Sequence, residues 1–477
     1  MKQKSILKNS LYNAIYKGFT VLFPLVTTSY ISRVLLPEGV GSVAYANTIV
    51  LYFVTIAALG IPNYGIKAIA QSAGEERDRT FVELLVINFC STSLCIIAYY
   101  LFVSTAAHFS GERSLFYIMG ILLILNYFNI DWFYQGIEEY GYIATRSIVI
   151  KILSFAAMLL FVRTREDYLK YALILCAATA GNYVLNAVHA GRYVRFRKYR
   201  LDLSRHMKAV LILLGSTIAT EIYTMLDTVM LEYFYGKSYV GYYSNSVKII
   251  RLVYTVSISL VATFYPRISY YIKQMDYRRC EDLLAKGFKT VILLAFPAAV
   301  GLALLADSIV LFLFGEPFMP ATGTIRILSV LVIVFSTAYL LGHIVLMAAG
   351  REKTIFYATL CGAGSNAVIN ALLIPPLRHY GAAIASVAAE LIVTTILVVN
   401  GRKICPIRID RHYWGSLIIS LLGMTAGVLL VRNFLPLRGT LLLASAIVAA
   451  VAVYGLLLVA TRNEIVEFFI DKFRSRL

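Results

Sequence analysis

The sequence predicts an all-α polytopic membrane protein, and three observations support that fold class. The 477 residues are 59% hydrophobic and only 15% charged, which is far too apolar for a soluble protein of this length. Apolar runs of about 20 residues, each long enough to cross a bilayer, recur from end to end. The alternating ten-residue segments of a membrane β-barrel do not occur in the sequence.

The apolar runs predict fourteen transmembrane helices, with two pseudo-symmetric groups of six followed by two further spans. These lie near 9–33, 39–60, 81–104, 114–137, 142–162, 168–190, 209–232, 238–265, 287–306, 322–349, 353–375, 380–400, 412–431 and 439–461. With the N-terminus inside, the inner connections carry 30 Lys and Arg residues and the outer ones carry 9. The excess of cations on one side predicts that both termini are cytoplasmic. The first span lacks a small-residue cleavage site, so no cleavable signal peptide is expected.

Short echoes between the two groups predict related halves. Val40 and Gly41 follow the first span as Val240 and Gly241 follow the seventh, and a proline stands near the inner end of each second helix. Parallel repeats predict two bundles about an axis along the membrane normal, with a central cavity between them that opens alternately to each side. The predicted domains are an N-terminal six-helix bundle (1–190), a basic cytoplasmic linker (191–208), a C-terminal six-helix bundle (209–402) and two additional transmembrane helices with an amphipathic cytoplasmic tail (403–477). The linker is interpreted first as an anchor against anionic lipid, with a regulatory or partner site as the alternative.

Charged residues inside the seventh and eighth spans predict the site. Lys248 and Arg251 are three residues apart and therefore share one helical face, to which Ser244 adds a hydroxyl. Charge at bilayer depth is costly and by default faces a watery cavity or a partner. An ammonium and a guanidinium on one face are suited to an anion such as a lipid phosphate. The alternative is that these cations pair with Glu221 or Asp227 and only hold helices together.

Other charges within spans extend the candidate site. Lys17 and Lys151 are candidates for further cavity contacts with phosphate, and snorkelling to the inner surface is the alternative for Lys17. Glu221 and Asp227 are candidates for coupling to a sodium or proton gradient. Their six-residue spacing sets them about 120° apart, so they do not form a ready-made carboxylate pair.

Four further residues are interpreted as structural. Asp131 is expected to pair with Lys151 or Arg146, and Glu390 to make a buried packing contact. His189 and His343 lack metal-ligand spacing, and the six cysteines show no CxxC motif, so no metal site is expected.

Several segments, in order along nearly the whole chain, carry a resemblance to a known family. They are RVLLPEGVGSVAYANTIVLYFVTIAALGIPNYGIKAIAQ, DWFYQGIEEYGYIATRSIVIKI, Asp227 with VGYYSNSVKI, FGEPFMPATGTIRILS and AAGREKTIFYATLCGAGSNAVINALLIPPLRHYGAAIASVAAE. The chain resembles the oligosaccharide and polysaccharide flippases (Wzx-like) of the multidrug/oligosaccharidyl-lipid/polysaccharide exporter superfamily. That superfamily also contains multidrug/cation antiporters and lipid II flippases.

The resemblance implies two six-helix bundles in a V, two extra C-terminal spans and no covalent chemistry. The implied cargo is a polyprenyl-pyrophosphate-linked oligosaccharide, moved from the inner to the outer leaflet. The resemblance also makes Arg33 a portal residue and matches Asp227 to an acidic position of the family. No cofactor is implied, and coupling to a sodium or proton gradient is left open.

We therefore expect a flippase of a bacterial plasma (inner) membrane that serves cell-surface polysaccharide biosynthesis. Its partners would be the lipid-linked oligosaccharide and membrane lipid, with polysaccharide polymerase or assembly proteins left open and nucleic acid not expected. The alternatives are a lipid II flippase and a multidrug/cation antiporter, which would need an acidic, apolar cavity. A membrane glycan polymerase or ligase is disfavoured, because the outer connections are short and no catalytic motif occurs.

Overall fold

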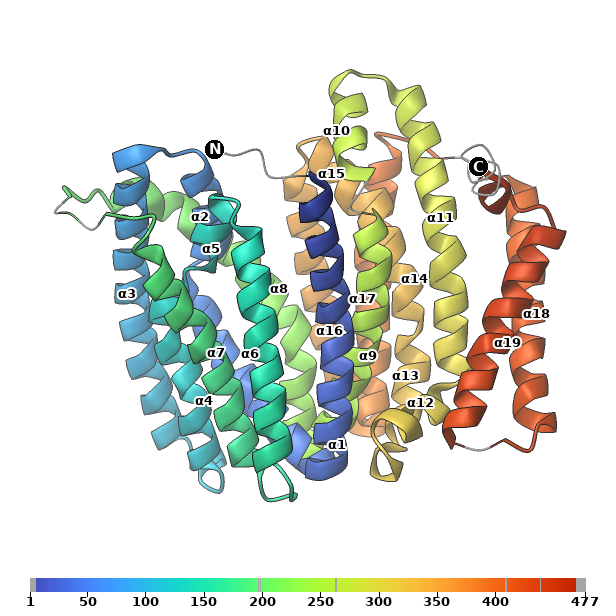
Figure 1. Cartoon of the computed structure of the whole chain (residues 1–477), viewed down its shortest axis with the longest axis horizontal. Coiled ribbons are helices and arrows are strands. Elements are labelled where there is room, and N and C mark those ends of the chain that lie inside the picture. The colour runs from blue at the N-terminus through green and yellow to red at the C-terminus, as the bar shows by residue number, and fades with distance from the viewer. Residues whose placement is uncertain are drawn as a thin grey trace. The chain divides into compact units, whose positions relative to one another are not determined.

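The computed structural model of the chain is built from helices throughout the part that it describes (Figure 1). The backbone is described for residues 6–468 except 196, 198, 262–263, 408–409 and 438, and side chains from residue 23 on, except also 216, 219–220, 222–223 and 260. Within these residues, 11 helical segments are long and apolar enough to cross a membrane. The predicted fold class, an all-α polytopic membrane protein, is confirmed. The number of fourteen spans stays a prediction.

The chain divides by its internal contacts into two compact units, residues 1–241 and 242–477. The helix at 204–235 belongs with the first unit in this division, whereas the sequence analysis placed it in a second bundle. The division at 191–208 and the other predicted domain bounds stay predictions.

The first unit consists of α1 to α8 and the start of α9. Its elements are α1 (Ile6–Ala58), α2 (Ile61–Ala70), α3 (Gly74–Thr105), η1 (Ala107–Phe109), α4 (Arg113–Leu125), η2 (Asn126–Phe128), α5 (Asp131–Gly136), α6 (Tyr140–Phe161), α7 (Tyr168–Ala190) and α8 (Ser204–Tyr235), followed by α9 (Lys237–Val261). The second arm of α1, residues 37–58, packs on α3 through Phe53 and on α4 through Tyr45. Helix α1 also packs on α8 and α6, while α6 and α7 form a neighbouring pair. Small side chains at a helix contact let the backbones of two membrane helices approach each other closely.

The long helix α1 contains two of the predicted spans, because it breaks at Leu36. That residue has φ 60° and ψ 177°, which interrupts the helix between the span at 9–33 and the span at 39–60. The break between α8 and α9 has the same backbone conformation, with φ 78° and ψ −176° at Gly236. The first break lies five residues before Gly41 and the second five residues before Gly241. The echo between the halves therefore corresponds to a repeated turn.

Two short helices repeat in the same way. Pro62 stands in the first turn of α2, and Pro266 in the first turn of α10 (Tyr265–Lys273). The ring of proline fits this position because the first turn of a helix has no internal partner for its N–H groups. The short helix α2 packs on α5, as α10 packs on the short helix α15 (Val345–Ala348).

One predicted span, 114–137, is not a single helix. It is interrupted after Asn126, so that α4, η2 and α5 follow one another. Asn126 is buried, and its amide donates to Asn88 Oδ1 at 3.1 Å and to Thr92 Oγ1 at 2.9 Å. Asn88 in turn donates to the backbone carbonyl of Asn126 at 2.7 Å. These side chains on α3 satisfy the backbone and amide groups that the interruption leaves without helical partners.

The second unit continues α9 and holds the remaining helices. These are α10, α11 (Tyr277–Leu304), α12 (Ala306–Leu313), η4 (Glu316–Phe318), α13 (Ala321–Leu328), α14 (Val330–Thr337), the π-helical segment η5 (Ala338–Ile344), α15, α16 (Glu352–Leu377), α17 (His379–Arg402), α18 (Arg411–Phe434) and α19 (Gly439–Ala460). Its apolar core lies between α11, η5 and α18 and includes Val291, Leu340 and Leu417. Helices α16 and α17 pack against each other as one hairpin, and α18 and α19 pack against each other as a second hairpin.

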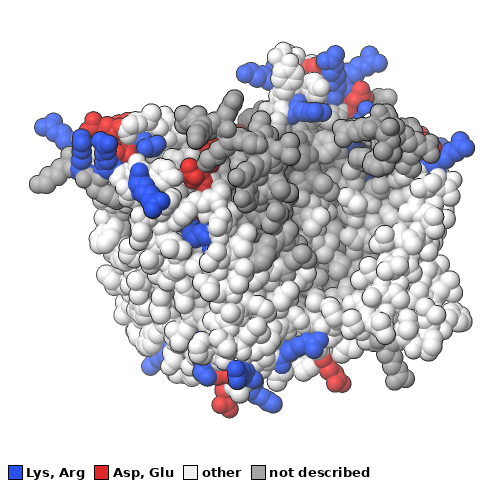
Figure 2. Space-filling model, in the orientation of Figure 1, with Lys and Arg blue, Asp and Glu red and all other residues white. Residues whose placement is uncertain are grey.

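Connections that the sequence analysis assigned to one side of the membrane lie together in the first unit. At one end, Lys237 contacts Glu112 across 2.7 Å, and Gly39 lies against Arg165 and Tyr168. At the other end, Arg205 contacts Glu76 across 2.5 Å. Over α3, α4 and α7, Figure 2 shows charged residues gathered at these two ends, with a nearly uncharged band between them. Such a band is the outer surface expected of helices that face hydrocarbon.

Candidate functional site

The candidate anion site lies on α9, where one face is anchored and another is open. The hydroxyl of Ser246 donates to the carbonyl of Ala321 at 3.4 Å, and the hydroxyls of Tyr243 and Ser386 are 2.8 Å apart. The ring of Tyr254 packs against that of Phe335 with centroids 4.6 Å apart. These contacts fix α9 against α13, α14 and α17, and so determine which side chains remain uncovered.

The uncovered side of α9 carries a polar stripe, defined here as Ser244, Lys248, Arg251 and Thr255. Their spacing of four, three and four residues keeps them on one helical face. Ser244 and Lys248 are half-buried, whereas Arg251 and Thr255 are exposed. Lys248 Nζ donates to Oδ1 of the fully buried Asn245 at 3.3 Å. The predicted pair of cations therefore shares one face, and Lys248 is held in place by a neutral amide.

Two acidic candidates lie on α8 in the first unit, next to the second arm of α1. Asp227 is buried and Glu221 half-buried, and both carboxylates are within electrostatic range of the hydroxyl of Tyr52. Both also interact with other groups. The alternative that they pair with the cations of α9 stays a prediction, and so does their coupling to an ion gradient.

The remaining predicted site residues are spread over α1 and α6. Arg33 is exposed and lies three residues before the break at Leu36. Lys151 is half-buried on α6, and none of the described carboxylates forms an ion pair with it. The side chain of Lys17 lies outside the described residues. Their roles in binding stay predictions.

Asp131 pairs with Arg146, which is one of its two predicted partners. Arg146 Nη1 lies 3.1 Å from Asp131 Oδ1 and also donates to the side chain of the buried Asn186. The pair ties α5 to α6 and α7. Glu390 is buried, as predicted, while His189 stacks on Tyr142 with ring centroids 4.0 Å apart. His343 stacks on Tyr339 with ring centroids 5.3 Å apart.

Sequence reasoning missed a buried charge cluster around Glu83 at the start of α3. Glu83 is fully buried and accepts from Arg79 at 2.9 Å, from Arg205 at 2.5 Å and from His206 at 2.9 Å. Removing one partner of a buried ion pair costs about 3–5 kcal/mol, so this cluster holds the beginning of α8 on α3. The available signal was a carboxylate inside the apolar run FVELLVINF.

A second missed feature joins the connection between α3 and α4 to the turn between α8 and α9. His108 Nε2 lies 2.8 Å from Glu232 Oε2, and Lys237 Nζ lies 2.7 Å from Glu112 Oε1. The partners are more than 120 residues apart in the chain, and nothing local in the sequence pairs them. In the part of the chain that the structure describes, no group of three or more His, Cys, Asp or Glu side chains could hold a metal ion.

An internally repeated, all-α membrane protein with charged side chains within its predicted spans has the architecture of a secondary transporter. The chain belongs to the family of polysaccharide biosynthesis proteins, whose family model matches residues 6–272. A second family model, MatE, matches residues 213–372. The resemblance inferred from the sequence is thereby confirmed.

Curated relatives agree with this assignment, and a solved structure shares the fold. A protein of Escherichia coli K12 named "Putative O-antigen transporter" is 24% identical over 411 residues, 84% of this chain and 97% of that protein. The succinoglycan biosynthesis transport protein ExoT of Rhizobium meliloti is 23% identical over 68% of this chain and 66% of its own length. The inward closed structure of the lipid II flippase MurJ superposes with a TM-score of 0.77 at 14% identity, over 96% of this chain and 99% of that one. At this identity the structural similarity shows the fold alone.

Proposed function

We propose that this protein is a flippase that moves a polyprenyl-pyrophosphate-linked oligosaccharide from the inner to the outer leaflet of a bacterial plasma membrane. Membership of the polysaccharide biosynthesis family supports this class of cargo, and the names of the relatives refer to transport of O-antigen and succinoglycan. The proposed function involves no covalent chemistry. Both termini lie on the cytoplasmic side, as the distribution of Lys and Arg predicts.

The observation that carries the proposal is the polar stripe on α9. Lys248 and Arg251 put two cations on one face of a helix whose opposite face is packed in the second unit. Two cations at membrane depth are costly unless they face water or bind an anion. A pyrophosphate offers two negative groups to this pair while the sugars stay hydrated, and the polyprenyl chain remains in lipid. Alternating access then presents the headgroup to the outer side.

The direct test is a flipping assay in proteoliposomes with a fluorescent polyprenyl-pyrophosphate oligosaccharide. The double variant Lys248→Ala/Arg251→Ala is expected to lose flipping while keeping its level and its elution profile in detergent. The control Arg278→Ala/Arg279→Ala removes two exposed cations at the start of α11 and is expected to flip normally. Normal flipping by the first variant would remove the stripe from the mechanism.

The same assay separates the alternative cargoes and the coupling ion. Transport of lipid II in preference to the oligosaccharide would favour a lipid II flippase, and gradient-driven movement of cationic dyes would favour an antiporter. A sodium or proton gradient that accelerates the wild type but not Glu221→Gln would support coupling at Glu221. Equal rates with and without either gradient would argue against it. A polysaccharide polymerase is the further partner that we propose for this protein.

A further inference from the structure

A polar cavity of about 440 Å³ lies where the connection between α7 and α8 crosses the first turns of α3. Four arginines line it: Arg77, Arg192, Arg195 and Arg197. Two carboxylates, Glu75 and Asp78, also line it. The arginines outnumber the carboxylates, so the cavity carries an excess of positive charge. A guanidinium cluster of this kind is suited to a phosphate group.

Hydrogen bonds build this cavity from two separate segments. Arg77 Nη2 donates to the carbonyl of Tyr193 at 3.2 Å, and the amide of Arg195 donates to Asp78 Oδ2 at 3.2 Å. The hydroxyl of Tyr199 donates to the carbonyl of Arg195 at 2.8 Å. The connection is therefore fixed against α3 at two points, and the exposed residues Arg192, Arg195 and Arg197 line the space beside it.

Two buried atoms of residues that line the cavity, Asp78 Oδ1 and Arg77 Nε, have no hydrogen-bond partner among the described residues. Asp78 is only 7% exposed, and its Oδ1 accepts no hydrogen bond although its Oδ2 is satisfied. A buried acceptor without a donor is destabilising, and such atoms are rare in native proteins. A ligand that fits this cavity would thus carry a negative group for the arginines and a hydroxyl donor for Asp78.

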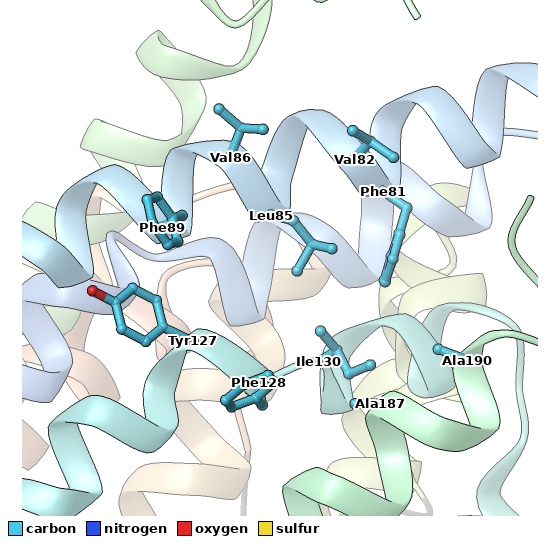
Figure 3. A pocket seen from close by; sticks show the side chains of 10 residues that line it. All are labelled: Phe81, Val82, Leu85, Val86, Phe89, Tyr127, Phe128, Ile130, Ala187 and Ala190. Atoms are coloured by element: carbon cyan, nitrogen blue, oxygen red, sulfur yellow. The ribbon is translucent and has the colours of Figure 1, made fainter. Parts of the chain in front are cut away.

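An apolar cavity of about 580 Å³ lies between α3, η2 and α7 (Figure 3). Figure 3 shows Phe81 and Leu85 of α3 facing Phe128 and Ile130 across the gap, with Ala190 of α7 beside them. Phe81 lies three residues after Asp78, or about 4.5 Å along the helix. Ala190 immediately precedes the connection that carries the arginines. The two cavities together form the α3–α7 seam.

We propose that the α3–α7 seam binds one phospholipid with an anionic glycerol headgroup, of the phosphatidylglycerol type. The arginines hold the phosphate, a glycerol hydroxyl donates to Asp78 Oδ1, and an acyl chain occupies the apolar cavity. Phe89 and Phe128 on the rim of that cavity are 60% and 46% exposed, which leaves it open toward the surrounding lipid. This site shares no residue with the polar stripe on α9, so the inference does not depend on the cargo.

The test is native mass spectrometry of the full-length protein after delipidation and titration with phosphatidylglycerol. Phosphatidylcholine and phosphatidic acid with the same acyl chains serve as comparisons. The wild type is expected to retain phosphatidylglycerol at least about tenfold better than phosphatidylcholine, which is the size of effect of one charge-assisted hydrogen bond. Arg195→Ala/Arg197→Ala is expected to lose that preference, whereas the control Arg278→Ala/Arg279→Ala keeps it.

Two further variants test the remaining contacts and do not remove the arginines. Asp78→Asn places an amide donor where an acceptor is needed, so the preference for phosphatidylglycerol over phosphatidic acid is expected to fall. Leu85→Trp fills the apolar cavity and is expected to weaken long-chain lipid while leaving dihexanoyl lipid unaffected. If the double arginine variant fails to fold, these two variants decide.

Three results would overturn the inference. The first is equal retention of phosphatidylglycerol and phosphatidylcholine by the wild type. The second is unchanged retention in Asp78→Asn and Leu85→Trp. The third is displacement of phosphatidylglycerol by an equimolar polyprenyl phosphate, which would make the seam a site for the cargo lipid. Loss of flipping in the variant lacking Lys248 and Arg251, with lipid retention intact, would keep the two sites distinct.

Discussion

The turn at Leu36 and the turn at Gly236 have the same backbone conformation but are built from different residues. Leu36 occupies the first break at φ 60° and ψ 177°, and Gly236 occupies the second at φ 78° and ψ −176°. This region of backbone space is essentially restricted to glycine, and another residue there costs about 1–3 kcal/mol. The fold thus imposes the conformation at both places, although only the second turn adopts it without strain.

The glycines that follow the two turns show the opposite behaviour, since neither can be replaced. A Cβ atom on Gly41 would lie 1.8 Å from the carbonyl oxygen of Lys237, and one on Gly241 would lie 2.1 Å from that of Pro37. Gly241 lies 200 residues after Gly41, and Lys237 lies 200 residues after Pro37. The second contact therefore repeats the first with the two halves exchanged. The two contacts are the reciprocal halves of one pseudo-two-fold crossing. The comparison shows that this fold tolerates local strain but not extra volume at the crossing.

The two turns also differ in what supports them. The loop after α6 covers the first turn, with the carbonyl of Arg165 near Gly39 and that of Val162 accepting from Tyr30 at 2.8 Å. The second turn is held by ion pairs, of which Lys237 with Glu112 is one. The first turn is thus supported mainly by backbone groups of a neighbouring loop, and the second turn mainly by ion pairs.

The largest effect is expected from adding volume at the crossing. Gly41→Val and Gly241→Val would each force a side chain into a backbone carbonyl, which cannot move as a flexible side chain can. We expect each to destabilise the protein by about 3 kcal/mol or more, because over-packed sites relax only by backbone shifts. Thermal unfolding of the protein in detergent, followed by fluorescence-detected size exclusion, measures this loss.

Gly215→Ala is the matched control, because a Cβ on Gly215 would meet none of the described residues within 4 Å. Alanine is favoured over glycine by about 1 kcal/mol inside a helix, so this change is expected to be neutral or stabilising. Wild-type stability in Gly41→Val would show that the two turns do not need close contact.

A smaller effect is expected from exchanging the residues at the breaks themselves. Leu36→Gly should be more stable than Leu36→Ala by about 1–3 kcal/mol, since alanine keeps the backbone strain and glycine removes it. Gly236→Ala should be destabilised by a similar amount, because the strain is then introduced at the second turn. The comparison of the three unfolding midpoints checks both expectations. Equal stability of Leu36→Ala and Leu36→Gly would show that the backbone at this position is not strained.

The smallest effect concerns the loop that supports the first turn. Asp167 accepts from the amides of Arg163 and Thr164 and pairs with Lys170 across 2.6 Å. The ion pair with Lys170 is the main cause that lowers the pKa of Asp167 below its usual value, and the two amides add to it. Because the folded pKa is depressed, this stabilisation is present above about pH 4 and is lost as the pH falls toward the folded pKa.

The corresponding measurement is the unfolding temperature between pH 6 and pH 3. We expect a steeper fall in the wild type than in Asp167→Asn, which cannot ionise. Parallel curves for the two proteins would show that Asp167 contributes nothing to the support of the first turn.

Much of the fold follows from local properties of the chain. The span predicted at 168–190 coincides with α7, and that at 142–162 differs from α6 by two residues at its start. The span at 114–137 was predicted as one helix because hydropathy does not report where a buried asparagine interrupts it. Leu36 illustrates the same limit, since no residue preference predicts a glycine-like conformation for leucine.

The sequence by itself determined the fold class, the pairing of related turns and the shared face of Lys248 and Arg251. Each of these depends on hydropathy or helical period, which act over a few residues. Only the tertiary structure decided that Glu83 binds Arg205, that Gly41 meets Lys237 and that arginines line a cavity between α3 and the connection after α7. Such contacts join residues more than 100 positions apart, and they are selected by the packing of whole helices and not by any local pattern.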